Sequence, residues 1–138
     1  MIAYIDSSVV LRWLLRGEDT LARAARGRTA GSSELMLIEC SRVIERLRLT
    51  GTIDDGEVAV AREALREVHA GLSIVPLSAA VKRRAAGSFP TVLGTLDAMH
   101  LATALLWAEQ AGEPLAVYTH DRQLGTGARA LGFEAPLG

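Results

Sequence analysis

The sequence predicts an α/β fold in which helices cover both faces of a central, mainly parallel sheet. Short runs of apolar and β-favouring residues alternate with longer segments whose apolar residues recur at helical spacing. Strands separated by helices favour parallel pairing with right-handed crossovers, which puts helices on both faces of the sheet. The chain has 138 residues, of which 49% are hydrophobic, so it can bury one substantial core. We therefore expect a single domain over residues 1–138.

The N-terminal half is predicted to contain one strand and four helices. A short apolar run ends at Asp6, and the helical pattern that follows Ser7 and Ser8 predicts a strand, a turn and a helix. A break is predicted at residues 31–33, where glycine and two serines interrupt the pattern. The predicted elements are a strand over residues 1–5, a helix from about residue 8, and helices over residues 20–28, about 35–49 and about 55–71.

The C-terminal half is predicted to contain two clear strands, three helices and a short last strand. Ser78 can cap a helix, residues 87–95 form a loop, and an unusually apolar helix follows that loop. The predicted elements are a strand over residues 72–77, a helix to residue 84, a long helix over residues 96–111, a strand over residues 115–119, a helix over residues 122–131 and a last strand over residues 133–135.

Composition excludes several classes of protein. The formal net charge is −1 and the aromatic content is 4%, so neither a strongly basic duplex-binding surface nor a stacking platform for several bases is expected. A single cysteine, Cys40, excludes an intramolecular disulfide and a thiolate zinc cluster and fits a reducing cytoplasm. No signal peptide and no apolar stretch of membrane-spanning length is expected, so we predict a cytoplasmic protein without a membrane helix.

Four acidic residues are predicted to converge at one edge of the sheet. In open parallel sheets, ligands bind beyond the carboxyl ends of the strands. Asp6 ends the first strand, and Asp121 follows the strand over residues 115–119 by two positions. Asp97 lies in the first turn of the long helix, and Glu39 lies early in the helix after the serine pair. Taken singly, each acid has a structural interpretation as a helix cap, a turn residue or a solvated charge.

The surroundings of these acids favour a metal site. Asp6 and Glu39 each interrupt an apolar run, and Asp97 shares an otherwise apolar helical segment with only two other polar residues, His100 and Thr103. Burying a carboxylate without a partner is costly, and clustered carboxylates repel one another unless they share protons or bind a hard cation. Oxygen ligands suit Mg²⁺, with Mn²⁺ as an alternative, and such a site can activate water for phosphodiester hydrolysis.

Other chemistry has little support in the sequence. The three histidines show no zinc-ligand spacing, and for His100 and His120 both a substrate contact and a hydrogen-bonding role stay open. The segment Gly125 to Ala130 matches a loose dinucleotide-binding pattern, but it does not directly follow a strand. No phosphate-binding loop of the Walker type and no Gly-x-Ser-x-Gly nucleophile elbow is present.

Four segments resemble the PIN-domain ribonucleases, specifically the VapC-type toxins of type II toxin–antitoxin pairs. The resemblance covers nearly the whole chain, and the segment from Leu96 to Ala104 is the most specific of the four. The segments are Ile5 to Ser8, Ser33 to Arg42, Leu96 to Ala104 and Thr119 to Arg122. A PIN-like three-layer α/β/α sandwich with a central mainly parallel sheet is the fold that this resemblance implies.

The resemblance also implies an activity and a site. It implies Asp6, Glu39, Asp97 and Asp121 as ligands of the catalytic Mg²⁺ or Mn²⁺, and these are the acids that the burial argument selects. It suggests that the hydroxyls of Ser8 and Thr119 support the metal ligands without binding the metal themselves. The implied reaction is hydrolysis of RNA, with a 5′-phosphate and a 3′-hydroxyl as products. A homodimer and a separately encoded antitoxin are implied as well, and operator DNA would be read by that partner, because this chain shows no DNA-reading segment of its own.

Three alternatives remain open at the level of sequence. A non-catalytic PIN-fold domain would use its groove only to bind a protein, although four intact acids argue against it. A structure-specific DNA nuclease would use the same metal chemistry, and a requirement for the 2′-hydroxyl would separate it from a ribonuclease. A small-molecule phosphohydrolase would turn over simple phosphomonoesters and would be indifferent to RNA.

Overall fold

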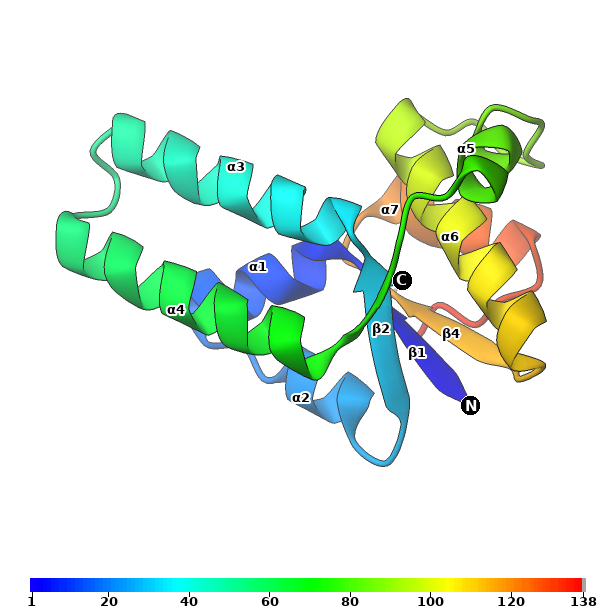
Figure 1. Cartoon of the computed structure of the whole chain (residues 1–138), viewed down its shortest axis with the longest axis horizontal. Coiled ribbons are helices and arrows are strands. Elements are labelled where there is room, and N and C mark those ends of the chain that lie inside the picture. The colour runs from blue at the N-terminus through cyan, green and yellow to red at the C-terminus, as the bar shows by residue number, and fades with distance from the viewer. Residues whose placement is uncertain (138) are drawn as a thin grey trace.

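The computed structural model describes residues 1–137 and has a small central sheet with helices on either side (Figure 1). The elements follow the alternation of strands and helices that the sequence predicts. In chain order they are β1 (Ile2–Ile5), α1 (Ser7–Arg16), α2 (Thr20–Ala25), β2 (Thr29–Ser33), α3 (Leu35–Leu49), α4 (Asp55–Gly71), β3 (Ser73–Val75), α5 (Ala79–Ala85), α6 (Thr95–Ala111), β4 (Leu115–Tyr118) and α7 (Arg122–Ala130).

The four strands form a wholly parallel sheet in the order β3-β2-β1-β4. The chain moves outward from β1 to β2 and β3, and then crosses back to place β4 on the other side of β1. The strand order therefore changes direction at β1, and ligands of open α/β sheets bind outside the carboxyl ends of the strands at such a point. This arrangement confirms the α/β prediction with a central parallel sheet.

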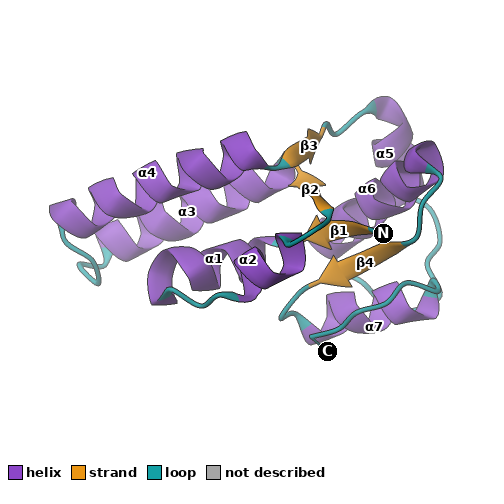
Figure 2. Ribbon diagram, turned by 90° about the horizontal axis from the view of Figure 1, so that it is seen from below, coloured by secondary structure: helices purple, strands orange, loops and turns teal. Residues whose placement is uncertain are grey.

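Two helical layers enclose the sheet, and Figure 2 shows α1 to α4 on one side and α5 to α7 on the other. Successive residues of a strand point to opposite faces, and β1 follows this rule. Ala3 and Ile5 pack among the buried residues of α1 to α4, whereas Ile2 and Tyr4 pack with residues of α6 and α7. All four of these side chains are buried. β1 therefore contributes to the hydrophobic core on both sides, which confirms the three-layer sandwich.

The prediction of a break at residues 31–33 is wrong, because this segment forms most of β2. Its sequence, TAGSS, has little of the apolar character that identifies a strand. Tertiary contacts explain the glycine. A Cβ atom on Gly31 would lie 2.5 Å from the carbonyl oxygen of Ser73 and 2.7 Å from the ring of Trp107. Position 31 of β2 is therefore a glycine because β3 and a tryptophan of α6 approach the backbone closely there.

The last predicted strand is also wrong in extent. Over residues 133–135 the structure has a single parallel bridge between Glu134 and Ala116, so the segment does not form a full strand. The predicted strand over residues 72–77 is shortened to β3, and the predicted helix over residues 20–28 ends at Ala25. Ser78 caps α5 as predicted, with its hydroxyl accepting a hydrogen bond from the Val81 amide at 3.2 Å.

Helix α6 carries two of the polar side chains near the sheet edge, Asp97 and His100. It runs for 17 residues and buries six of them, so its first half lies deep in the fold. Gly94 precedes its first turn without a side-chain cap, and Asp97 supplies the acidic group of that turn. Within residues 1–137, no helix is both long and apolar enough to cross a membrane.

Candidate active site

Polar side chains gather where β1 and β4 end, at the point where the strand order changes direction. Asp6 directly follows β1 and caps α1, and Asp121 caps α7 after β4. Glu39 comes from the second turn of α3, and Asp97 and His100 come from the first turns of α6. The fold therefore brings residues from four separate segments to one edge of the sheet, as the sequence predicts for its four acids.

Asp6 is held by one of its two carboxylate oxygens. The hydroxyls of Ser8 and Thr119 both donate to Oδ2 at 2.8 Å, and the Ser8 amide donates to the same atom at 3.4 Å. Ser8 Oγ in turn accepts from the His120 amide at 2.9 Å, and Thr119 Oγ1 accepts from the Asp121 amide at 2.9 Å. The buried Asp6 is thus tied to both strand ends, while within residues 1–137 its Oδ1 accepts no hydrogen bond and has the His100 imidazole 3.5 Å away.

Glu39 is held in the same way. The Ser7 hydroxyl donates to Oε1 at 2.6 Å, and Nε2 of His100 contacts the same oxygen at 2.6 Å. Within residues 1–137, Oε2 of Glu39 takes part in no hydrogen bond. Glu39 therefore also has one anchored oxygen and one that can bind something else.

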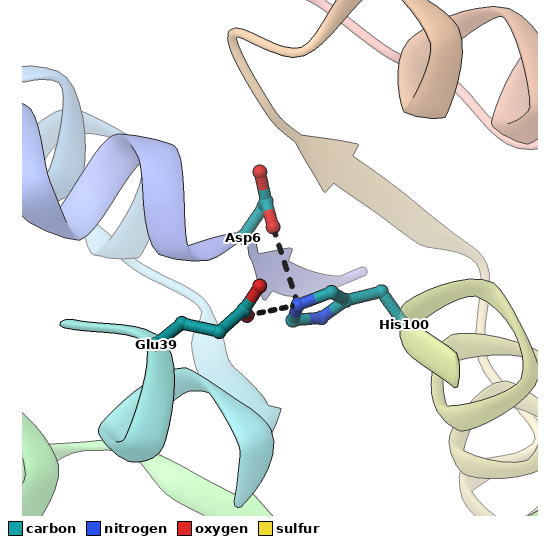
Figure 3. A group of neighbouring side chains, drawn as sticks. All are labelled: Asp6, Glu39 and His100. Atoms are coloured by element: carbon teal, nitrogen blue, oxygen red, sulfur yellow. Dashed lines mark hydrogen bonds and ion pairs between the residues drawn. The ribbon is translucent and has the colours of Figure 1, made fainter. Parts of the chain in front are cut away.

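His100 lies between the two carboxylates, as Figure 3 shows. Its Nε2 is 2.6 Å from Glu39 Oε1 and 3.5 Å from Asp6 Oδ1. Its Nδ1 forms a 2.6 Å hydrogen bond with the buried phenol of Tyr4, and the two rings meet edge to face. One atom from each of Asp6, Glu39 and His100 lies within 4.8 Å of the other two, so these three residues form a group of metal-site dimensions.

Asp97 and Asp121 are neighbours of this group rather than members of it. The pKa of Asp97 is raised from 3.8 to about 6, first by burial and then by the negative charges of Asp121 and Asp6. Asp121 is exposed, and its Oδ1 accepts the Leu124 amide at 2.9 Å as the cap of α7. Asp97 is therefore partly buried and lies close enough to Asp121 and Asp6 for their charges to act on it.

The histidine and the glutamate shift each other's titration. Burial lowers the pKa of His100, but its hydrogen bond to Glu39 and the charges of Asp6, Glu39 and Asp97 raise it more, so the net change is upward. Burial raises the pKa of Glu39, but the hydrogen bond and charge of His100 and the Ser7 hydroxyl outweigh it, so the net change is downward. At neutral pH Glu39 is therefore an ionised carboxylate.

The donor set fits a divalent cation. Open oxygens on Asp6 and Glu39, together with the carboxylate of Asp97, are the hard ligands that Mg²⁺ and Mn²⁺ prefer. Burial, followed by the charges of Asp121 and Asp6, raises the pKa of Asp97, and a bound cation would offset both effects by favouring the ionised carboxylate. Both ring nitrogens of His100 form hydrogen bonds, Nδ1 with Tyr4 and Nε2 with Glu39, so the carboxylates are the available ligands.

The chain resembles known proteins in sequence and in fold. The PIN domain family matches residues 3–126. This chain belongs to the PIN-domain family. Two PIN-domain relatives come from Mycobacterium tuberculosis. Ribonuclease VapC47 of strain CDC 1551 / Oshkosh is 31% identical over 137 residues, and Ribonuclease VapC46 of strain ATCC 25618 / H37Rv is 33% identical over 133 residues. Each match covers 94% of this chain and 92% of the relative.

Solved structures confirm the PIN fold. A VapBC2 complex from Rickettsia felis, bound to a DNA fragment from its promoter, contains a chain that matches with a TM-score of 0.69 at 15% identity, covering 98% of this chain and 97% of that one. The protein PAE2754 from Pyrobaculum aerophilum matches with a TM-score of 0.62 at 19% identity, covering 92% of this chain and 79% of that one. The resemblance to VapC-type PIN domains that the four sequence segments carry is thus confirmed.

The sequence predicted four acids and two supporting hydroxyls for the site, but other groups that hold these acids were missed. It predicted supporting hydroxyls at Ser8 and Thr119, and both contact Asp6. It left two roles open for His100, and the structure shows hydrogen bonds to Glu39 and Tyr4. Ser7 and Tyr4 were not predicted. The available signal for Tyr4 was a phenol inside a short apolar strand, since a buried tyrosine hydroxyl usually has a polar partner.

Proposed function

We propose that this chain is a metal-dependent endoribonuclease and the toxin of a toxin–antitoxin pair. One observation carries the proposal. Asp6 and Glu39 each have one carboxylate oxygen held by hydrogen bonds, and they lie near Asp97, whose pKa is raised to about 6. They lie at the ligand-binding edge of the sheet in a chain related to two ribonucleases of the VapC type. Asp6, Glu39, Asp97 and Asp121 are the proposed ligands of Mg²⁺ or Mn²⁺.

The proposed reaction is the addition of water to an RNA phosphodiester. When bound, the divalent cation supplies Lewis-acid chemistry that makes water a better nucleophile and offsets charge on the phosphate. Asp6 and Glu39 present their open oxygens, and Ser8, Thr119, Ser7 and His100 keep them in place. The oxygen of water forms a bond to phosphorus, and the bond from phosphorus to the 3′-oxygen breaks. The products are a 5′-phosphate and a 3′-hydroxyl, which takes up a proton.

The substrate that we propose is a single strand or loop of RNA. The chain has a net charge of −1 and few aromatic residues, so it lacks the means to open a duplex or to bind a long one through phosphates. The RNA backbone must reach the acidic residues at the sheet edge, so the cleaved segment has to be accessible. Backbone accessibility is greatest in RNA loops and unpaired segments.

The partners that we propose are a cognate antitoxin and a second copy of this chain, in the cytoplasm. A toxin–antitoxin complex from Klebsiella pneumoniae and the VapBC2 complex have chains of this fold, with 18% and 15% identity to this chain. An apolar groove of about 470 Å³ lies between α1 and the start of α4, and the exposed side chains of Leu15 and Val60 line it. An exposed apolar groove of this kind supports the proposal that a protein partner binds this chain. Operator DNA would be read by the antitoxin.

Cleavage of a labelled, structured RNA by the purified protein tests the activity. We expect cleavage with Mg²⁺ or Mn²⁺, none with chelator, and none by the Asp97→Asn variant. Cleavage of single-stranded DNA of the same sequence at an equal rate would favour the DNA nuclease. Turnover of a simple phosphomonoester without RNA cleavage would favour the small-molecule phosphohydrolase. A folded, antitoxin-free protein that cuts no RNA in a broad pool with either metal would contradict the proposal and favour a protein-binding domain.

A further inference from the structure

We infer that Tyr4 and His100 are positioning residues that fix which oxygen of Glu39 faces the bound cation. This inference rests on the cation binding of the proposed function, and it adds two residues to the four proposed ligands and two supporting hydroxyls. Its basis is a chain of contacts from Tyr4 on β1 through His100 on α6 to Glu39 on α3. Figure 3 shows the second contact, between His100 and Glu39.

The first step is the orientation of the imidazole. His100 is 1% exposed, and Tyr4 is fully buried in β1 against α6. The 2.6 Å contact between the Tyr4 phenol and Nδ1 fixes the rotation of the ring. The contact works in either protonation state, because a phenol can donate to a bare nitrogen or accept from an N–H group. Nε2 is therefore directed toward Glu39 and Asp6 whether His100 is neutral or charged.

The second step is the orientation of Glu39. Nε2 of His100, on α6, and the Ser7 hydroxyl, on α1, both contact Oε1 at 2.6 Å. The two helices lie on opposite sides of the sheet (Figure 2). Two donors on one oxygen determine the rotation of the carboxylate and leave Oε2 as the oxygen that can bind a cation. Glu39 is a partly exposed side chain with three rotatable bonds, so without these donors it would sample several orientations.

The third step is the spacing between Glu39 and Asp6. Oδ1 of Asp6 lies 3.5 Å from the same Nε2, while Oδ2 of Asp6 is taken by Ser8 and Thr119. Nε2 of His100 thus contacts an oxygen of each carboxylate, which fixes Glu39 and Asp6 relative to one another. Partners that orient metal ligands in this way change metal affinity by about 10- to 100-fold when they are removed.

Mn²⁺ titration by calorimetry, with chain variants compared at one pH, tests the inference without using activity. His100→Leu removes the donor, His100→Gln keeps an N–H group near the position of Nε2, and Tyr4→Phe removes only the phenol oxygen. Two matched controls each remove one hydroxyl from a buried residue. Thr103→Val lies one turn beyond His100 on α6 and loses a bond to the Met99 carbonyl, and Tyr118→Phe lies on the opposite face of the sheet.

We expect the dissociation constant of Mn²⁺ to rise about tenfold in His100→Leu and by a smaller factor in Tyr4→Phe, and to return toward wild type in His100→Gln. The controls should bind Mn²⁺ like wild type even where their melting temperatures fall. In RNA cleavage, a fall in kcat with KM for RNA unchanged is expected for His100→Leu, with partial recovery at saturating Mn²⁺.

Three results would overturn the inference: wild-type Mn²⁺ affinity in folded Tyr4→Phe and His100→Leu, equal losses in the two controls, or no Mn²⁺ binding by the wild-type protein. If His100→Leu does not fold, Tyr4→Phe decides alone, because it keeps the ring volume. A wild-type protein that binds Mn²⁺ through this arrangement but cuts no RNA would leave the positioning role in place and remove only the proposed ribonuclease activity.

Discussion

Replacing Asp97 by asparagine is expected to abolish RNA cleavage and, at the same time, to stabilise the cation-free protein at neutral pH. The folded chain raises the pKa of this carboxyl from 3.8 to about 6 through burial and the charges of Asp121 and Asp6. A raised pKa of an acid means that the ionised form is disfavoured by folding. The cost is present in full above pH 6 and disappears as the pH falls to 3.8. An uncharged amide of the same shape removes it.

The size of this effect follows from the shift. At about 1.4 kcal/mol for each pKa unit, the shift sets an upper limit of about 3 kcal/mol. Asp97 is only partly buried, and water screens its interactions, so we expect about 1 kcal/mol in the free energy of unfolding. For a chain of this length that gain corresponds to a melting temperature about 3 °C higher.

Thermal unfolding followed by circular dichroism in the presence of EDTA measures this gain. At pH 7.5 Asp97→Asn should melt about 3 °C above wild type, and at pH 4 the two proteins should melt together. Glu63→Gln, which neutralises an exposed acid in the middle of α4, is the control and should change little. A variant that melts at or below wild type at pH 7.5, or that gains equally at both pH values, would refute the reasoning.

Three further predictions follow from other contacts. The wild-type protein should bind Mn²⁺ about tenfold more weakly at pH 5 than at pH 7, because Asp97 must lose its proton to bind the cation. Calorimetry at the two pH values checks this, and equal affinities would contradict it. Thr119→Val should weaken Mn²⁺ binding about tenfold and cost about 1 to 2 kcal/mol, because Asp6 loses a donor and the Asp121 amide loses its acceptor; an unchanged urea midpoint and an unchanged affinity would count against it. Gly31→Ala should cost about 2 kcal/mol in urea unfolding because its Cβ would meet backbone of β3, whereas Gly71→Ala, with open space around it, should not destabilise, and equal midpoints would contradict the packing argument.

The parts of the fold that sequence predicted are those with a strong local pattern. β1, β4 and α6 are apolar runs with definite ends, and the structure places them where the pattern does. β2 was missed because its identity depends on contacts across the fold. The close approach of Trp107 and Ser73 to Gly31 requires a small residue, and small residues alone do not indicate a strand.

The site divides in the same way. Asp6, Glu39 and Asp97 could be identified because a charge inside an apolar segment is costly and needs a reason. The groups that hold them could not, because their partners are far apart in the chain. Ser7 and Glu39 are separated by 32 positions, His100 and Glu39 by 61, and Tyr4 and His100 by 96. Pairings at that separation are set by the register of the sheet and the packing of α3 and α6.

The chemistry of the cleaved RNA ends tests the central claim most directly. A 3′-end-labelled and a 5′-end-labelled RNA would be cut with Mn²⁺, with and without EDTA, and the new ends identified by mass spectrometry. Attack by water under metal control predicts a 5′-phosphate and a 3′-hydroxyl, formed only with the cation and absent in Asp6→Asn. A 2′,3′-cyclic phosphate formed in the presence of EDTA, or by Asp6→Asn at the wild-type rate, would contradict the account.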